Sequence, residues 1–335
     1  MSVSGCTGVR SARLPWWRRW APVAGLLLLS PFCAEYLIGY QGVITNPVGQ
    51  VVGVVMVLPI YGAPAVLIRE VVRRTGRGWP AMLLLAAAAG LVQAGLVDQS
   101  LFNRAEYTDA AAHTLIPGLG VDVSQLLIFV VGHIVWSFGA PIAVVEACVP
   151  ARAGRPWLGW PGLAVLAVVY VAGAVFYYFQ LVVAVGFHAT PVQLGVVVLA
   201  VAAAVAAAFA VPRRTGEATG AAPPVWVAGL VALALLTADI LVGDQWAWLG
   251  VALSASALAV LAVLLLAWSR RTGWGDLHVL VAAGAALLVY AALAFAVNPG
   301  HVSRFELYAA RGVVFVCVAA LLLWAGRRVR AVTAA

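Results

Sequence analysis

Three ionisable side chains of this sequence lie inside long apolar stretches, where a charge is costly. Glu35 follows a leucine-rich run, Asp98 ends an alanine-rich run, and His133 lies near the middle of a third apolar segment. An ionisable group at mid-bilayer costs between about 2.5 and more than 10 kcal/mol, so it needs a partner or a wet cavity. Carboxylates and an imidazole in one pocket can transfer protons. We therefore predict that Glu35, Asp98 and His133 are catalytic acid–base groups of one site.

Four further residues accompany these groups along the chain. Tyr36 and Gln93 lie close to the two carboxylates in sequence, Trp136 lies one turn after the imidazole, and Glu146 lies near the end of the same segment. We predict that these four residues bind the substrate, with Tyr36 and Gln93 orienting the reacting groups. A structural network that only holds three helices together is the alternative, and the sequence leaves the choice open.

Charged residues also gather at the ends of apolar segments. Glu70 can reach Arg73 at i+3 or Arg74 at i+4 on one helix face. Local ion pairing and snorkelling to the membrane interface are the simpler interpretation of this group.

Arg311 lies about two turns inside the last apolar segment and is the costliest group of the carboxy-terminal half. Asp239, Asp276 and Glu306 are its candidate partners, and the sequence does not choose among them.

The composition shows what kind of chain positions these residues. Of 335 residues, 64% are apolar and 10% are charged, with a mean hydropathy of +1.03, which excludes a soluble, disordered or disulfide-built chain. All 20 basic residues are arginine and lie mostly in short loops, so the net charge of +8 indicates lipid headgroups as partners and no nucleic acid. The four cysteines have no metal-ligand spacing, so we predict no metal site, and any cofactor is unknown.

Apolar runs of about 20 residues predict a polytopic bundle of transmembrane helices, an all-α fold with about ten spans. The predicted spans are 22–41, 48–72, 79–101, 123–149, 158–182, 191–211, 225–243, 246–268, 276–298 and 305–325.

Arginines recur before the first span and in every second loop after it, at 10–19, 73–77, 152–155, 213–214, 270–271 and 327–330. By the positive-inside rule, both termini are cytoplasmic, in a multi-pass protein of a bacterial plasma membrane. Residues 1–183, the first five helices, contain the polar core. Residues 190–330, the other five, are predicted to form an apolar supporting scaffold.

Two segments carry a resemblance to a known family. Gly90-Leu91-Val92-Gln93-Ala94-Gly95-Leu96-Val97-Asp98 and Phe129-Val130-Val131-Gly132-His133 resemble the G-L-x-E-E-x-x-x-R and F-x-x-x-H motifs of the CPBP intramembrane proteases, which include CAAX prenyl proteases and bacteriocin-processing enzymes. In that family the glutamates and histidines are thought to activate water or bind a metal. Here Gln93 and Ala94 replace the paired glutamates and Asp98 replaces the arginine, so only the position of His133 carries over.

The resemblance implies a membrane protein that binds or processes a hydrophobic peptide or a lipid-linked substrate. If the protein is an enzyme, Asp98 or Glu35 provides the acid group in place of the absent glutamates. A carrier is the alternative, because ten spans in about 335 residues are similar to the drug/metabolite transporters, which pair two five-helix halves.

Overall fold

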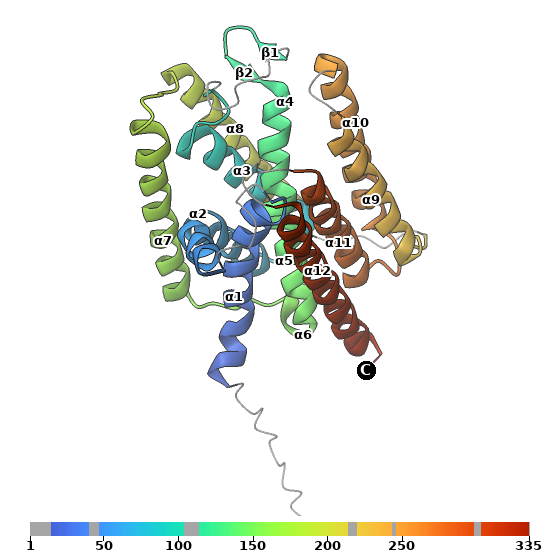
Figure 1. Ribbon diagram of the computed structural model, residues 1–335. Helices are drawn as coiled ribbons and strands as arrows, with labels where there is room; N and C mark the ends of the chain where they lie inside the picture. Colours follow the sequence, from blue (N-terminus) through green and yellow to red (C-terminus); the bar gives the residue numbers. More distant parts are fainter. Residues whose placement is uncertain are drawn as a thin grey trace, which may run out of the picture.

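The protein is an all-α bundle in the computed structural model, which describes residues 15–39, 47–103, 114–213, 220–242, 246–297 and 303–334 (Figure 1). The helices and strands are α1 (Trp16–Pro31), η1 (Phe32–Tyr36), α2 (Pro47–Arg74), α3 (Trp79–Val92), η2 (Gln93–Val97), β1 (Leu115–Ile116), β2 (Val121–Asp122), α4 (Val123–Leu126), η4 (Leu127–Val131), η5 (His133–Gly139), α5 (Ala140–Cys148), α6 (Pro150–Ala153), α7 (Trp160–Tyr178), η6 (Phe179–Val183), α8 (Pro191–Ala210), α9 (Val225–Leu241), α10 (Ala247–Trp268), α11 (Asp276–Leu293), η8 (Ala294–Ala296) and α12 (Arg304–Thr333). Segments η1, η2, η4, η5 and η6 are π-helical turns that continue α-helices, and η8 is a 3-10 turn.

Each of the ten predicted spans corresponds to a helical segment, so the predicted polytopic fold is confirmed. Among the described residues, eight helical segments are long and apolar enough to cross a membrane, and α9 is a shorter apolar helix. Helix α12 continues beyond the predicted end of its span, to Thr333, because arginine is a good helix former and hydrophobicity marks only the membrane-spanning part.

Arginines gather at one end of the bundle, which we call the arginine end: Arg18, Arg73, Arg152, Arg213 and Arg328. Arg152 donates hydrogen bonds to backbone carbonyls at the start of α1, Arg213 donates to Thr75, and Arg328 donates to Cys148. The start of α1 and the end of α12 both lie at this end (Figure 1). Residues 10–14 and 214 of the predicted arginine pattern lie outside the described residues. The location of the arginine end on the cytoplasmic side of the membrane stays a prediction.

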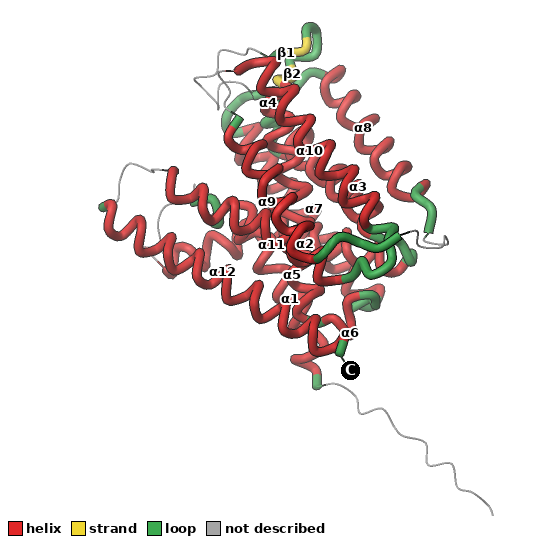
Figure 2. Tube along the Cα trace, turned by 90° about the vertical axis from the view of Figure 1, so that its right-hand side faces the viewer, coloured by secondary structure: helices red, strands yellow, loops and turns green. Residues whose placement is uncertain are grey.

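The inner and outer helices do not follow the two halves of the sequence. About half of the residues in the most apolar stretch of α3 and of α11 are buried inside the protein, but only 11% in α7 and 6% in α10. Figure 2 shows α8 and α12 at opposite edges of the bundle. Helix α11 packs against α5 and α9, and α8 packs along α3. Lipid and a helix interface are both apolar, so composition alone does not indicate which helix is inside.

A short hairpin covers the end of the bundle opposite the arginine end. Strand β1 pairs with β2 in antiparallel register, with Leu115 opposite Asp122. Asp122 then caps α4 by accepting hydrogen bonds from the backbone N–H groups of Ser124 and Gln125. The Gln193 amide donates to the Leu119 carbonyl at 2.7 Å, which ties the hairpin to α8.

Helices α1 and α2 approach each other backbone to backbone at Gly62, where an added Cβ would overlap the Leu27 carbonyl oxygen. Gly62→Ala is therefore expected to lower the free energy of unfolding by about 1–3 kcal/mol, because neither backbone can move away. Unfolding in mixed detergent micelles measures this loss. The control is Gly195→Ala on exposed α8, where nothing lies within 4 Å of the added Cβ. Equal stability of the two variants would contradict the prediction.

Candidate functional site

Tyr61, in the middle of α2, is the centre of a polar cluster formed by four helical segments. Its hydroxyl donates a 2.5 Å hydrogen bond to Oε1 of Glu35 in η1. Its ring lies 5.8 Å from the His133 ring of η5, centroid to centroid. Asp98, at the end of η2, lies close enough to both the Tyr61 hydroxyl and His133 for electrostatic interaction. The structure thus brings Glu35, Asp98 and His133 together around one phenol, and we call these four residues the Tyr61 cluster.

The His133 ring is fixed in one orientation by its own helix. Nδ1 lies 2.6 Å from the Phe129 carbonyl oxygen, and because a carbonyl only accepts, Nδ1 carries a proton. His133 is buried, and its Nε2 has no hydrogen-bond partner within the described part of the chain. In the neutral ring, Nε2 is therefore an available acceptor that points into the bundle.

Gln93 and Asp98 form a second polar pair beside the imidazole. The Gln93 amide donates to Asp98 Oδ2 at 3.4 Å, and the backbone N–H of Ser100 donates to Oδ1 at 2.9 Å. The Gln93 carbonyl oxygen Oε1 is buried and has no partner among the described residues. The site thus has two buried acceptors, His133 Nε2 in the Tyr61 cluster and Gln93 Oε1 beside it, to which a water molecule or a substrate N–H can donate.

Local backbone features hold these side chains together. Glu35, Gln93 and His133 all belong to π-helical turns, a geometry that often marks functional sites. A Cβ at Gly90 would lie 2.9 Å from the Cβ of His133, so only glycine lets α3 approach η5 this closely. The Ser30 hydroxyl lies within hydrogen-bond distance of the Tyr61 and Ser137 carbonyls, at 3.0 and 2.5 Å, and so links α1, α2 and η5.

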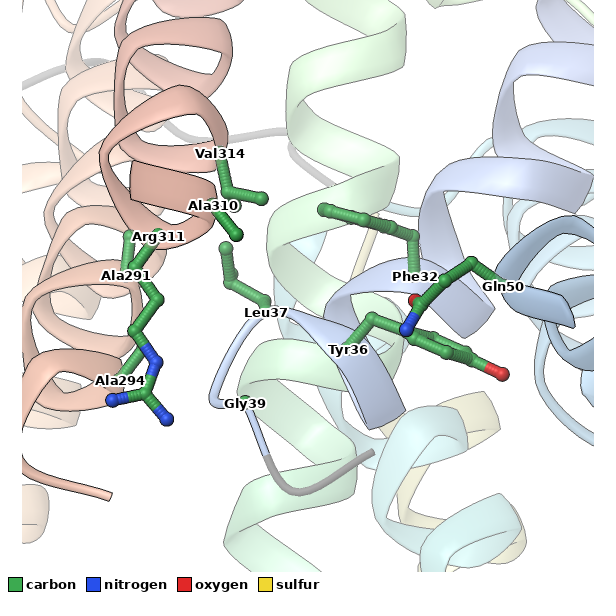
Figure 3. Close-up of a pocket in the computed structure, with 10 residues that line it drawn as sticks. All are labelled: Phe32, Tyr36, Leu37, Gly39, Gln50, Ala291, Ala294, Ala310, Arg311 and Val314. Carbon is green, nitrogen blue, oxygen red and sulfur yellow. The ribbon is translucent and has the colours of Figure 1, made fainter. Parts of the chain in front are cut away.

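Two of the predicted substrate-binding residues make their contacts elsewhere. The Trp136 indole donates to the Ala286 carbonyl at 2.8 Å, and its ring stacks on Tyr290 of α11 with centroids 3.8 Å apart. Tyr36 stacks on Phe32 and lines a pocket next to α11 and α12 (Figure 3). Trp136 therefore packs η5 against α11, and the predicted role of both residues in substrate binding stays a prediction.

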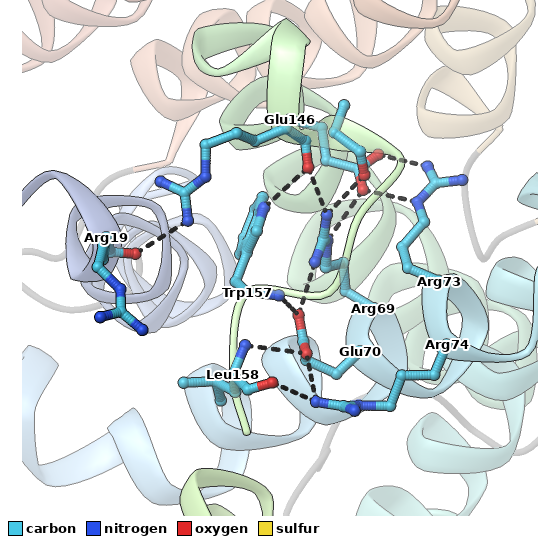
Figure 4. Close-up of polar contacts among 10 residues, drawn as sticks. Arg19, Arg69, Glu70, Arg73, Arg74, Glu146, Trp157 and Leu158 are labelled. Carbon is cyan, nitrogen blue, oxygen red and sulfur yellow. Dashed lines mark hydrogen bonds and ion pairs between the residues drawn. The ribbon is translucent and has the colours of Figure 1, made fainter. Parts of the chain in front are cut away.

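Glu146, the fourth of these residues, lies in a buried charge network near the arginine end (Figure 4). Its Oε1 accepts hydrogen bonds from Nε of Arg69 at 3.0 Å and from Nε of Arg73 at 2.8 Å, and its Oε2 accepts from Nη2 of Arg73 at 2.5 Å. Eight residues, or about 12 Å of α2, separate Arg69 from Tyr61. Glu146 thus belongs to a second polar layer, apart from the Tyr61 cluster.

The rest of this network ties α2 to the turn between α6 and α7. Arg69 pairs with Glu70 at 2.6 Å, and its guanidinium stacks 3.5 Å from the centroid of the Trp157 ring. Glu70 also accepts a hydrogen bond from the Trp157 backbone N–H at 2.8 Å and pairs with Arg74 at 3.4 Å. The predicted local ion pairing is therefore present at i+4. Arg69 and Glu70 do not snorkel to the membrane interface, because both side chains are fully buried.

Arg311 has none of the partners that the sequence offered. Within the described residues no carboxylate pairs with it, and its Nη1 and Nη2 have no hydrogen-bond partner. Asp239 accepts a hydrogen bond from Ser254, and Glu306 accepts one from Ser303 at 2.7 Å. Asp239 is thus bonded to the neighbouring helix α10 and Glu306 to the residue that caps its own helix, and neither contacts Arg311.

Sequence reasoning did not identify Tyr61, nor Tyr177 of α7, which lies close enough to Tyr61 and Glu35 to interact with them. A signal for Tyr61 was present, because a hydroxyl between two mid-span prolines, Pro59 and Pro64, is an unusual feature of a membrane helix. Among the described residues, no group of three or more His, Cys, Asp or Glu side chains is placed to hold a metal ion.

These features define a polytopic, all-α integral membrane protein with a polar cluster inside its helix bundle. A model of an uncharacterized membrane protein family matches residues 26–219, more than half of the chain, and the chain belongs to this family. No curated protein and no solved structure matches the chain. The matched range contains the Tyr61 cluster and the Glu146 network, whereas α9 to α12 lie beyond it.

Proposed function

We propose that this protein is an intramembrane acid–base hydrolase that acts on a hydrophobic or lipid-linked substrate at the Tyr61 cluster. The observation that carries the proposal is the convergence of Glu35, Asp98 and His133 from three helices on the Tyr61 side chain. Burying several ionisable groups together in hydrocarbon is costly, and such groups inside membrane spans usually have a functional role.

Each member of the cluster has a role that follows from its geometry. Nε2 of His133 accepts a proton from an attacking water, whose second hydrogen is held by the Gln93 carbonyl oxygen. Asp98 lies close enough to stabilise the imidazolium that forms. Glu35 is the acid that gives a proton to the leaving group, and the Tyr61 hydroxyl, which donates a 2.5 Å hydrogen bond to Glu35 Oε1, holds it in place. The proton that His133 took from water then returns to Glu35, which restores the site. No step uses a metal ion.

The resemblance to the CPBP proteases supports the position of His133 alone, and His133 belongs to the Tyr61 cluster. Gln93 and Asp98 stand at motif positions but differ in residue type from the family, so their roles rest on their contacts in this structure. The paired glutamates are absent, so Glu35 of η1 takes over the acid in this proposal. The substrate reaches the cluster through the bilayer, which favours a molecule with a hydrophobic part.

Incubation in H₂¹⁸O tests the proposal without knowledge of the substrate, because hydrolysis places ¹⁸O in the product. The purified protein in lipid nanodiscs is incubated with bacterial membrane extract and lipid-linked peptides, and products are detected by mass spectrometry. We expect ¹⁸O-labelled products from the unmodified protein and about 10²–10⁴-fold less from Glu35→Gln. Glu306→Gln, on the exposed first turn of α12, is the matched control. Absence of labelled product above empty nanodiscs, or equal rates for both variants, would contradict the proposal.

A further inference from the structure

Arg311 is a buried cation that pairs with no anion among the described residues. Its residue is only 5% exposed, and the two terminal guanidinium nitrogens have no hydrogen-bond partner within the described ranges. Arginine remains protonated in proteins. Sixteen residues, or about 24 Å of α12, separate Arg311 from Arg327 at the arginine end, which places it within the depth of the hydrocarbon core. A cation held at this depth is costly unless an anion joins it.

The guanidinium lies in a pocket between η1, α11 and α12, shown in Figure 3. The cavity volume open to a water-sized molecule is about 30 Å³, which is enough for a small polar group. Among the described residues that line the pocket, Arg311 is the only charged one, and most of the wall is apolar. The apolar wall consists of Phe32, Leu37, Ala291, Ala294, Ala310 and Val314.

The backbone next to the Arg311 guanidinium has a glycine that leaves space for it. Gly39 has a φ of +84°, which disfavours any residue with a side chain. A Cβ at this position would lie 3.3 Å from Nη2 of Arg311. Glycine at this turn thus leaves room for the guanidinium beside the backbone.

We propose that this pocket binds the anionic group of an amphiphile, a phosphate or a carboxylate, with Arg311 as its counter-charge. A guanidinium forms two parallel hydrogen bonds with either anion. The hydrocarbon part of the ligand packs on the alanine-rich wall of α11 and α12 and extends toward the bilayer. A free phosphate ion has the same head chemistry, but the depth and the apolar wall favour an amphiphile. This proposal goes beyond hydrolysis at the Tyr61 cluster and does not depend on turnover there.

Lipid binding to the purified protein tests the proposal. Phosphatidylglycerol, phosphatidylcholine and diacylglycerol with identical chains, oleate, and inorganic phosphate are each titrated, and binding is followed by native mass spectrometry and thermal unfolding. We expect saturable binding of phosphatidylglycerol or oleate, weakened about 30-fold or more in Arg311→Gln. Arg311→Lys should retain part of the affinity because it keeps the charge. Arg304→Gln, on the exposed start of the same helix, is the matched control.

Stability without anionic lipid gives an independent readout. Arg311→Met is expected to unfold at a higher temperature than the unmodified protein in neutral detergent, because it removes an unpaired buried charge. A structural arginine would show the opposite sign. Equal binding of phosphatidylcholine and phosphatidylglycerol, unchanged binding by Arg311→Gln, or destabilisation by Arg311→Met would each overturn the proposal. Full saturation by inorganic phosphate alone would overturn the assignment to an amphiphile.

Discussion

Replacing His133 by asparagine is expected to lower the rate of ¹⁸O incorporation by about 10²–10⁴-fold while the protein remains folded. The asparagine amide can still donate to the Phe129 carbonyl, as Nδ1 of the imidazole does at 2.6 Å. Only Nε2, which has no partner among the described residues, is lost. The substitution therefore removes the proposed base and preserves the contact that orients it. The measurement is initial rate against pH for both proteins.

The pH profile separates a chemical role of His133 from a packing role. If Nε2 accepts the proton, the rate of the unmodified protein depends on pH in a way that the variant, which has no imidazole, does not share. His188→Asn, in an exposed loop, is the matched control and should keep both rate and profile. A His133→Asn protein that keeps the rate, or one that loses rate only in proportion to its loss of folded protein, would refute the assignment.

Glu146→Gln is expected to lower the free energy of unfolding by about 3–5 kcal/mol, the largest effect on stability that we predict. The substitution leaves Arg69 and Arg73 without the carboxylate that both contact, and Arg69 is fully buried. Removing one partner of a buried ion pair costs more than the pair contributes, because the remaining charge stays desolvated. Reversible unfolding in mixed detergent micelles measures the loss, with Glu306→Gln as the exposed control.

A double-mutant cycle distinguishes the ion-pair role of Glu146 from substrate binding. The pair Arg73→Gln and Glu146→Gln should cost less together than the sum of the two single variants, because both substitutions remove the same ion pair. If Glu146 serves mainly to bind substrate, as the sequence suggested, Glu146→Gln would keep its stability and lose affinity. Additive losses from the two substitutions would contradict the buried network as a stabilising unit.

The polar residues of the candidate site were predictable only in part. Glu35, Asp98 and His133 stand out in the sequence because ionisable residues are rare in membrane spans. The free-energy cost of burying such a group in hydrocarbon implies that it has a polar partner. Tyr61 does not stand out in this way, because a tyrosine is tolerated in an apolar helix. Its role depends on Ser30, Gly62 and Gly90, which set how closely the neighbouring helices approach.

The pairing of charges was less predictable still. Glu70 and Arg74 follow the i+4 rule, so their contact was expected from local spacing. The contact between Arg69 and Glu146 joins residues 77 positions apart, and no local rule chooses it. None of the three candidate partners predicted for Arg311 pairs with it, for the same reason. A charge inside a span indicates that a partner is needed, but it does not indicate which residue the partner is.

The sequence by itself determined that this chain is a polytopic all-α membrane protein, and it located the spans. Both follow from a local requirement, since about 20 apolar residues cross the hydrocarbon and a helix satisfies its backbone hydrogen bonds within itself. Only the tertiary structure decided which side chains meet. The rotation of each helix and the helices that it contacts depend on close approaches at small residues and on π-helical turns. The hydropathy pattern does not show either of them, because a helix surface that faces lipid is as apolar as one that faces another helix.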